Sequence, residues 1–154
     1  MNIVDVHQYL AATFFPGIAI TDPEIASIQK AYPMTPDLDA ALTDIPCVIM
    51  PGFELQAVMF HSAFIEERYA VRAQVFVKRA EVQQSIGAQM AASFLTAIGL
   101  ALSSHQRLGQ TASLVRGLRG ERDTLVSLTW AGVSYIGLDL WIDITLKTSK
   151  EHAA

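Results

Sequence analysis

The chain has 154 residues, of which 51% are hydrophobic and only 17% are charged, and its formal net charge is −4. This length suits one domain with its own core, and the acidic balance argues against a general nucleic-acid coat, which needs a basic surface. About a quarter of the residues in an average globular protein are charged, so the deficit predicts subunit interfaces. The single cysteine, Cys47, excludes an internal disulfide and fits a small packed hydrophobe in a reducing compartment.

The first 44 residues are predicted to form a helical arm. Apolar residues recur at helical spacing over residues 3–15, and Pro16-Gly17 ends that helix. Asp22-Pro23-Glu24 is typical of a helix start and predicts a second short helix through Ile28, followed by a possible single turn at residues 38–42. Repeated proline interruptions favour an arm that wraps around the core.

Three strands are predicted in the middle of the chain. Residues 46–50 form a short apolar strand that Pro51-Gly52 ends, and residues 55–60 favour a second strand slightly over a helix. The clearest of the three covers residues 65–78, where apolar and polar side chains alternate. Its predicted apolar face consists of Tyr69, Val71, Ala73, Val75 and Val77.

A helix of about six turns is predicted over residues 81–104. Its expected inward stripe is Ile86, Met90, Phe94, Ala97, Ile98 and Ala101, with Leu95 and Leu102 on the flank. The uncharged run 90–102 is shorter than the ~20 residues that cross a bilayer, so we expect a buried helix. Most other side chains in it are small, which leaves two interpretations: the second side contacts a neighbouring subunit, or the helix is central and tightly packed.

The C-terminal region predicts a β-hairpin around which the other elements are arranged. Residues 126–130 and 138–146 alternate in polarity, Ala131-Gly132 lies between the two strands, and Gly137 marks a bulge or kink. Trp130 should be buried on the inward face of the hairpin, and Phe94 on the helix that covers it. A short strand at residues 112–115 precedes the hairpin.

These elements predict an α+β fold: a mostly antiparallel sheet with one long helix packed on one face and a helical N-terminal arm. Residues 1–44 are the arm and residues 45–154 the α+β core of a single domain. The N-terminal residues show no signal-peptide pattern.

The sequence contains little that would indicate a catalytic site or a metal site. His7, His61, His105 and His152 are scattered without ligand spacing, and we predict no catalytic residue, metal or cofactor. Asp139 and Asp143 share a strand face, which fits a carboxylate pair less well than the solvated face of a strand. The GxxG at residues 117–120 matches a nucleic-acid backbone clamp in form, but a solvated turn explains it better.

Four segments in order resemble the tail terminator proteins of long-tailed bacteriophages. They are IPCVIMPG, ERYAVRAQVFVKR, a long Ala-rich helix ending near SSHQRLG, and LTWAGVSYIGLDLWIDITL. Together they cover about two thirds of the chain, and the order and spacing carry the resemblance. The N-terminal third departs from it, being longer and richer in proline interruptions.

The resemblance implies a virion protein, assembled in the host cytoplasm, that forms a homo-oligomeric ring, typically a hexamer. Such a ring caps the tail tube and provides the surface on which the head docks, so its partners are the tube protein and a head-completion or connector protein. DNA would meet it only as passing genome, and no membrane is involved. Another neck or connector component is the nearest alternative, and a small-molecule-binding or enzymatic α+β domain is a more distant one.

A basic segment between the last helix and the hairpin is the candidate docking site. Arg116, Arg119, Arg122 and Asp123 lie among glycines and are predicted to form a mobile loop on an otherwise acidic protein. Guanidinium groups can bind carboxylates of a docking protein bidentately. We favour a partner surface over the lumen, because repeated arginine rings would hold DNA and slow its passage. The alternative is a solvated turn.

Overall fold

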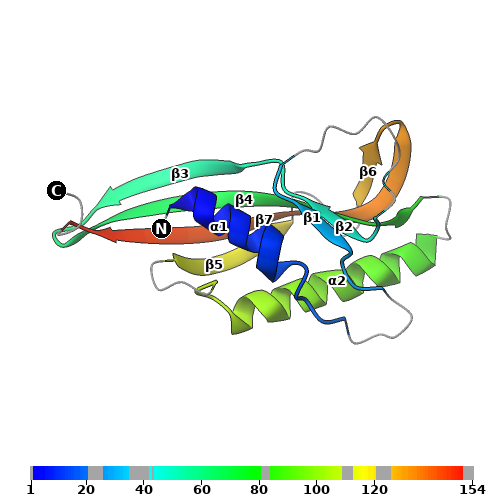
Figure 1. The fold of residues 1–154 in the computed structure, drawn as a ribbon, viewed down its shortest axis with the longest axis horizontal. Helices are drawn as coiled ribbons and strands as arrows, with labels where there is room; N and C mark the ends of the chain where they lie inside the picture. The colour runs from blue at the N-terminus through cyan, green and yellow to red at the C-terminus, as the bar shows by residue number, and fades with distance from the viewer. Residues whose placement is uncertain are drawn as a thin grey trace.

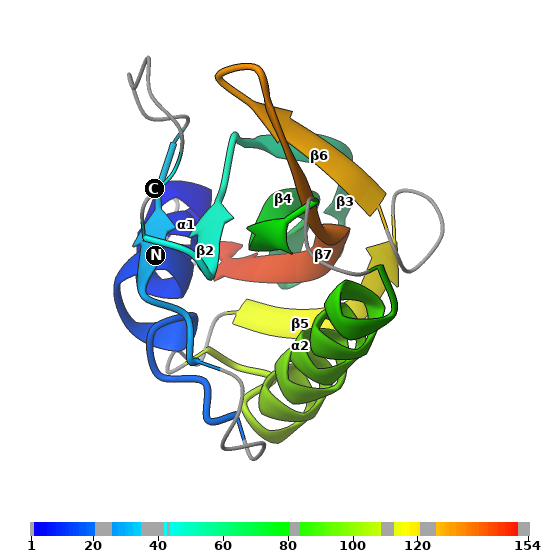
Figure 2. The ribbon, with the colours of Figure 1, turned by 90° about the vertical axis from the view of Figure 1, so that its right-hand side faces the viewer.

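The structure, a computed structural model, describes residues 2–20, 26–34, 42, 44–80, 84–108, 113–120 and 126–150. It is a mixed α+β fold in which seven strands form one curled sheet accompanied by two α-helices (Figures 1 and 2). In chain order the elements are α1 (Ile3–Tyr9), the π-helical segment η1 (Leu10–Phe14), β1 (Lys30–Tyr32), β2 (Cys47–Ile49), β3 (Phe53–Phe60), β4 (Phe64–Arg79), α2 (Gln84–Ser104), β5 (Ser113–Gly120), β6 (Val126–Trp130) and β7 (Val133–Ser149).

The antiparallel pair of β4 and β7 is the centre of the sheet. Both strands are long, and they pair along almost their whole length, from Phe64 opposite Ser149 to Arg79 opposite Tyr135. The free side of β4 pairs with β3 at one end and with β2 at the other, while the free side of β7 pairs with β5 and β6. β1 adds to β2 in parallel. The predicted sheet is therefore confirmed as mostly antiparallel.

Alternation along β4 and β7 produces two different faces. On the face that we call the covered face, the buried side chains are Val71, Ala73, Val75, Val77, Leu138, Leu140, Ile142, Ile144 and Leu146. They form one apolar cluster with residues of α1, η1 and α2. The opposite face, which we call the open face, carries Arg72, Asp139, Trp141 and Asp143. Both predicted alternation patterns are confirmed.

The β6–β7 hairpin has the predicted turn. Ala131 and Gly132 have φ values of +50° and +76°, as the two-residue turns that match strand twist require. The irregularity expected near Gly137 lies on the facing strand, where the register shifts between Phe76 and Lys78 of β4. Gly137 is needed there, because a Cβ would overlap the carbonyl oxygen of Val75.

The N-terminal third begins as predicted and then differs. Asn2 and Asp5 form a reciprocal capping box at the start of α1. The second short helix predicted through Ile28 is not observed, because residues 26–29 have no regular structure and the next element is β1. The expected helix start at residues 22–25 and the turn over residues 38–41 lie outside the described residues. Val6, Leu10, Phe14 and Phe15 are buried in the main core, so the first helical segment contributes directly to it.

Helix α2 packs on the covered face, but its stripe is shifted from the predicted one. The residues buried along it are Gly87, Ala91, Phe94, Ile98 and Leu102, whereas Met90, Ala97 and Ala101 are only half-buried. Ile86 has no described side chain. By length and composition Gly87–Ser104 could cross a membrane, as core helices of soluble proteins also could, and 28% of it is buried. Helix α2 is buried on the side that packs on the sheet and exposed on the other, so the alternative of a central, tightly packed helix is wrong, while the contact of its second side with a neighbouring subunit stays a prediction.

Phe94 is fully buried as predicted, but Trp130 is not its partner. Trp130 is half-buried against a second, smaller cluster that includes Cys47, Phe76, Leu128 and Tyr135. The sheet register places Phe76 and Tyr135 on the open face, at the end of the β4–β7 ladder where β6 folds back. Trp130 and Phe94 therefore lie on opposite faces of the sheet.

Candidate assembly surfaces

The predicted basic loop is in part a strand. Arg116 and Arg119 both lie on β5, which continues to Gly120 instead of ending at Val115. Arg119 binds Asp143 of β7 through two hydrogen bonds, of 2.8 Å from Nε and 3.0 Å from the guanidinium NH2. Arg122 and Asp123 lie outside the described residues. Hence Arg119 is fixed by a neighbouring strand, while Arg116 is exposed at the edge of the sheet.

The open face is held by ion pairs that cross between strands. Arg72 of β4 donates to Asp139 of β7 at 3.0 Å and 2.6 Å, and its guanidinium carbon lies 5.5 Å from the centre of the Trp141 ring. Asp139 and Asp143 are thus each bound by a separate arginine, so both carboxylates have a structural role in joining neighbouring strands. This arrangement agrees with a strand face and gives no sign of a shared catalytic proton.

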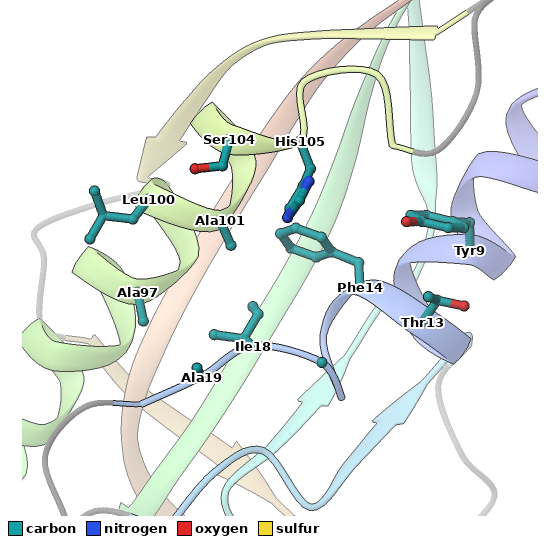
Figure 3. A pocket seen from close by; sticks show the side chains of 11 residues that line it. Tyr9, Thr13, Phe14, Ile18, Ala19, Ala97, Leu100, Ala101, Ser104 and His105 are labelled. Carbon is teal, nitrogen blue, oxygen red and sulfur yellow. The ribbon is translucent and has the colours of Figure 1, made fainter.

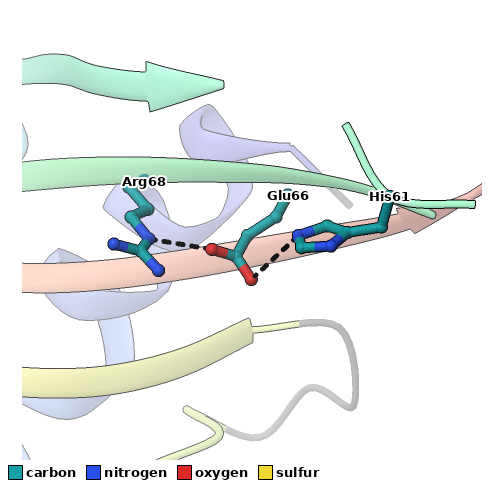
Figure 4. A network of polar contacts seen from close by, with 3 residues as sticks. All are labelled: His61, Glu66 and Arg68. Carbon is teal, nitrogen blue, oxygen red and sulfur yellow. Dashed lines mark hydrogen bonds and ion pairs between the residues drawn. The ribbon is translucent and has the colours of Figure 1, made fainter. Parts of the chain in front are cut away.

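A third polar group lies at the end of the β3–β4 hairpin. Arg68 Nε donates to Glu66 at 2.8 Å, and the imidazole of His61 is 3.9 Å from the other carboxylate oxygen (Figure 4). The hydrogen bond from Arg68 lowers the pKa of Glu66, and the nearby positive charges act in the same direction. This carboxylate is therefore ionised and structurally engaged at neutral pH.

Strand β3 exposes more large apolar side chains than any other described element. Phe60 is 78% exposed and Leu55 57%, and Phe53, Val58 and Met59 are also exposed. Such a concentration on one strand is unusual for a surface that faces only water. This surface was not predicted from the sequence. The available signal was the run FELQAVMF, which has a single charge and no polar face.

A groove runs along the outer side of α2, where the first helical segment and the chain after it lie beside the helix (Figure 3). Its larger part has a volume of about 460 Å³ and includes Phe14, Ile18, Ala101 and His105. An adjoining part of about 310 Å³ continues past Ala92 and Thr96, and Leu100, which is 64% exposed, borders both. No residue of Gln84–Ser104 is charged. The outward side of α2 therefore carries no charge and borders an open groove.

The remaining reactive groups are buried or separated. Burial raises the pKa of the Cys47 thiol to about 12, with the charge of Asp44 adding to the shift, so Cys47 is a neutral packed group. Burial lowers the pKa of His7. His105 borders the groove along α2, whereas His61 lies at the β3–β4 hairpin, so these two do not line a common pocket. Among the described residues, no three His, Cys, Asp or Glu side chains gather as metal ligands would.

No protein-family model matches the chain, and no curated protein sequence matches it.

Proposed function

We propose that this chain is a structural virion protein, a tail terminator that assembles into a ring, caps the tail tube and provides the surface for head docking. The observation that carries the proposal is α2: a long helix without charge, of which only one face is buried in the monomer. An uncharged, exposed helix face beside an open groove is what a subunit interface leaves uncovered in an isolated chain. The exposed strand β3 is a second surface of the same kind.

The placement of the polar groups also supports assembly over catalysis. The charged side chains of the open face are bound in cross-strand pairs, and the groove along α2 is lined mainly by small and apolar residues. An enzyme site would instead need polar groups that converge on a cavity. The choice of tail terminator over another neck or connector component rests on the sequence resemblance, and the hexameric ring has the same basis.

The docking role predicted for the basic segment now depends mainly on its last two residues, Arg122 and Asp123. Arg119 stabilises β5 through Asp143, and Arg116 occupies the sheet edge, so Arg122 and Asp123 remain the candidates for docking another protein. Replacement of Arg122 by Ser together with Asp123 by Asn should leave ring formation intact and weaken capping. A double variant that caps tubes and joins heads normally would remove this role.

Tube-end binding can be tested with tail tubes assembled from purified tube protein. A cap binds ends, so shearing a fixed mass of tubes into shorter pieces should increase the amount of chain that sediments with them in proportion to the number of ends. Binding that follows tube mass, or no binding at all, would contradict the proposed function.

A further inference from the structure

Among the described residues, β1, β3, β5 and β6 each pair with one strand only, and β3 and β5 lie on opposite sides of the central β4–β7 pair. In the part of the chain that the structure describes, β3 pairs only with β4 and β5 pairs only with β7, so each strand has one free side (Figure 1). A free side presents unpaired backbone N–H and C=O groups, which readily accept another strand. The two edges belong to the same sheet, so joining β3 of one copy to β5 of another would continue it.

The β3 edge is apolar on the covered-face side. The register with β4 places Phe53, Leu55, Val58 and Phe60 on the same face as Val71 and the main core. Of the residues that face them on β4, Val71 is buried and Tyr69, Glu67 and Ile65 are half-buried, whereas these four side chains are exposed, Phe60 most of all. The only charged residue of the strand is Glu54, which lies on the open face opposite Ala70.

The β5 edge has complementary features. It borders a hollow of about 170 Å³ beside α2, lined on the helix by Gly99, Leu102 and Ser103. The N–H of Val115 already donates to the carbonyl oxygen of Gln106 at 2.6 Å, so the stretch left for pairing is residues 116–120. Both charged residues of β5 are arginines: Arg116 is exposed and lines the hollow, whereas Arg119 lies on the open face, bound to Asp143. The free stretch is therefore basic and lies next to a hollow on the covered-face side.

We propose that β3 of one copy of this chain adds to residues 116–120 of β5 in the next copy. In that arrangement the apolar side chains of β3 lie over the hollow beside α2, next to the aliphatic part of Arg116, and Glu54 lies on the open face, where β5 carries Arg119. The two surfaces differ, so the contact is head-to-tail and repeats from copy to copy, as a closed ring requires. The inference rests on the proposed ring function and names the surfaces that build the ring.

The pairing can be broken at a single backbone donor. The N–H of His61 donates to the carbonyl oxygen of Phe64 at 3.0 Å, which makes these two residues a hydrogen-bonded pair. Because such pairs alternate along antiparallel strands, the N–H of Val58 points away from β4. Val58→Pro removes that donor and spares the bonds to β4, while Val58→Ala keeps it. We expect Val58→Pro to weaken self-association, measured by sedimentation velocity, by about tenfold, and Val58→Ala to weaken it much less.

Charge reversal provides a second, side-chain test that does not disturb the strand. Glu54→Arg and Arg116→Glu should each weaken self-association. The first places two basic side chains, residue 54 and Arg119, on the same face of adjoining strands, and the second places a carboxylate against the apolar side chains of β3. Lys30→Glu makes the same kind of change on β1, away from both edges, and should have no effect. Thermal melting confirms that each variant is folded.

Mixing two defective copies gives the sharpest result. Arg116 is exposed and is skipped in the register between β5 and β7, so Arg116→Glu should fold normally and weaken the β5 edge. Val58→Pro and Arg116→Glu should each stay monomeric alone, whereas together they should form only dimers of about 34 kDa, from two chains of 16.8 kDa. Each dimer joins the intact β3 of one copy to the intact β5 of the other.

Two outcomes overturn the proposal. One is a wild-type chain that stays monomeric at its highest soluble concentration, even if Val58→Pro then impairs tube binding, since that would assign β3 to the tube protein. The other is self-association that neither edge variant weakens. Tube-end binding by the wild type is measured separately, so the ring-capping function can survive the loss of this contact.

Discussion

The two faces of the β4–β7 ladder are built from the same alternating strands but are stabilised in different ways. The covered face is apolar and depends on α1, η1 and α2 to exclude water. The open face carries Arg72–Asp139 and Arg119–Asp143, yet Ala70, which lies opposite Asp143, and Thr145, which lies opposite Arg68, are almost fully buried. Long charged side chains that lie flat can thus cover a strand where no helix does. Stability therefore depends on filled apolar volume on the covered face, whereas on the open face it depends on ion pairs and, at the β6 end, on the smaller apolar cluster around Phe76 and Tyr135.

The largest expected effect is on the covered face. Phe94→Ala should lower the free energy of unfolding by ~3–5 kcal/mol, because it removes a fully buried ring and leaves a cavity. Leu100→Ala, on the exposed side of the same helix, should change it by less than about 0.5 kcal/mol. Urea unfolding measures both. Similar losses for the two variants would mean that the sides of α2 are assigned wrongly.

A smaller but still clear loss of stability is expected at Gly137 of β7, which faces the backbone of β4. Gly137→Ala places a methyl group against the carbonyl oxygen of Val75 and should cost about 1–3 kcal/mol. Gly99→Ala in α2 has open space and should stabilise the helix by about 0.5–1 kcal/mol. A lower melting temperature for Gly137→Ala and a higher one for Gly99→Ala would support the contact between Gly137 and the backbone of β4. A melting temperature that Gly137→Ala leaves unchanged would contradict it.

The open face should respond more weakly. Asp139→Asn should cost about 1 kcal/mol, because Arg72 is partly exposed and keeps access to water. Asp143→Asn should cost less, since Arg119 is about half exposed. A double-mutant cycle with Arg72→Ala isolates the first pair. A coupling energy between Arg72 and Asp139 as large as the loss for Phe94→Ala would contradict this account, because the open face would then contribute as much to stability as the covered face.

The smallest effect concerns pH. Burial lowers the pKa of His7 below its ordinary value of 6.5, so the unfolded chain binds the proton more readily than the folded chain. The contribution of the neutral imidazole is complete above pH 6.5 and declines as the pH falls through the lowered pKa. His7→Phe should flatten that part of the stability profile, and a profile unchanged by the substitution would show that His7 does not contribute.

The long strands could be predicted from the sequence because alternation is a local signal. The same signal fails for β1, which has three residues and is stabilised by parallel pairing with β2, a segment distant in sequence. It also fails for β5, where Gly117 and Gly120 suggest a loop although the pairing with β7 continues through them. For α2, small residues occupy much of the surface, so the sequence could not distinguish the buried stripe from its neighbour.

The assembly surfaces were only partly predictable for a related reason. The charge deficit and the uncharged helix indicated interfaces, but exposure of β3 depends on which strands lack a helix above them. Likewise, Arg119 looked like part of a mobile basic loop because its partner, Asp143, is on a different strand. Such pairings are set by register, which the alternation of each strand alone does not determine.

The most direct test of the ring-cap function is electron microscopy of tail tubes incubated with the purified chain. We expect a ring of subunits at one end of the tubes, and tubes that stop growing once the ring is bound. A folded, soluble chain that never appears at tube ends, and in whose presence tubes grow as freely as without it, would contradict the central claim.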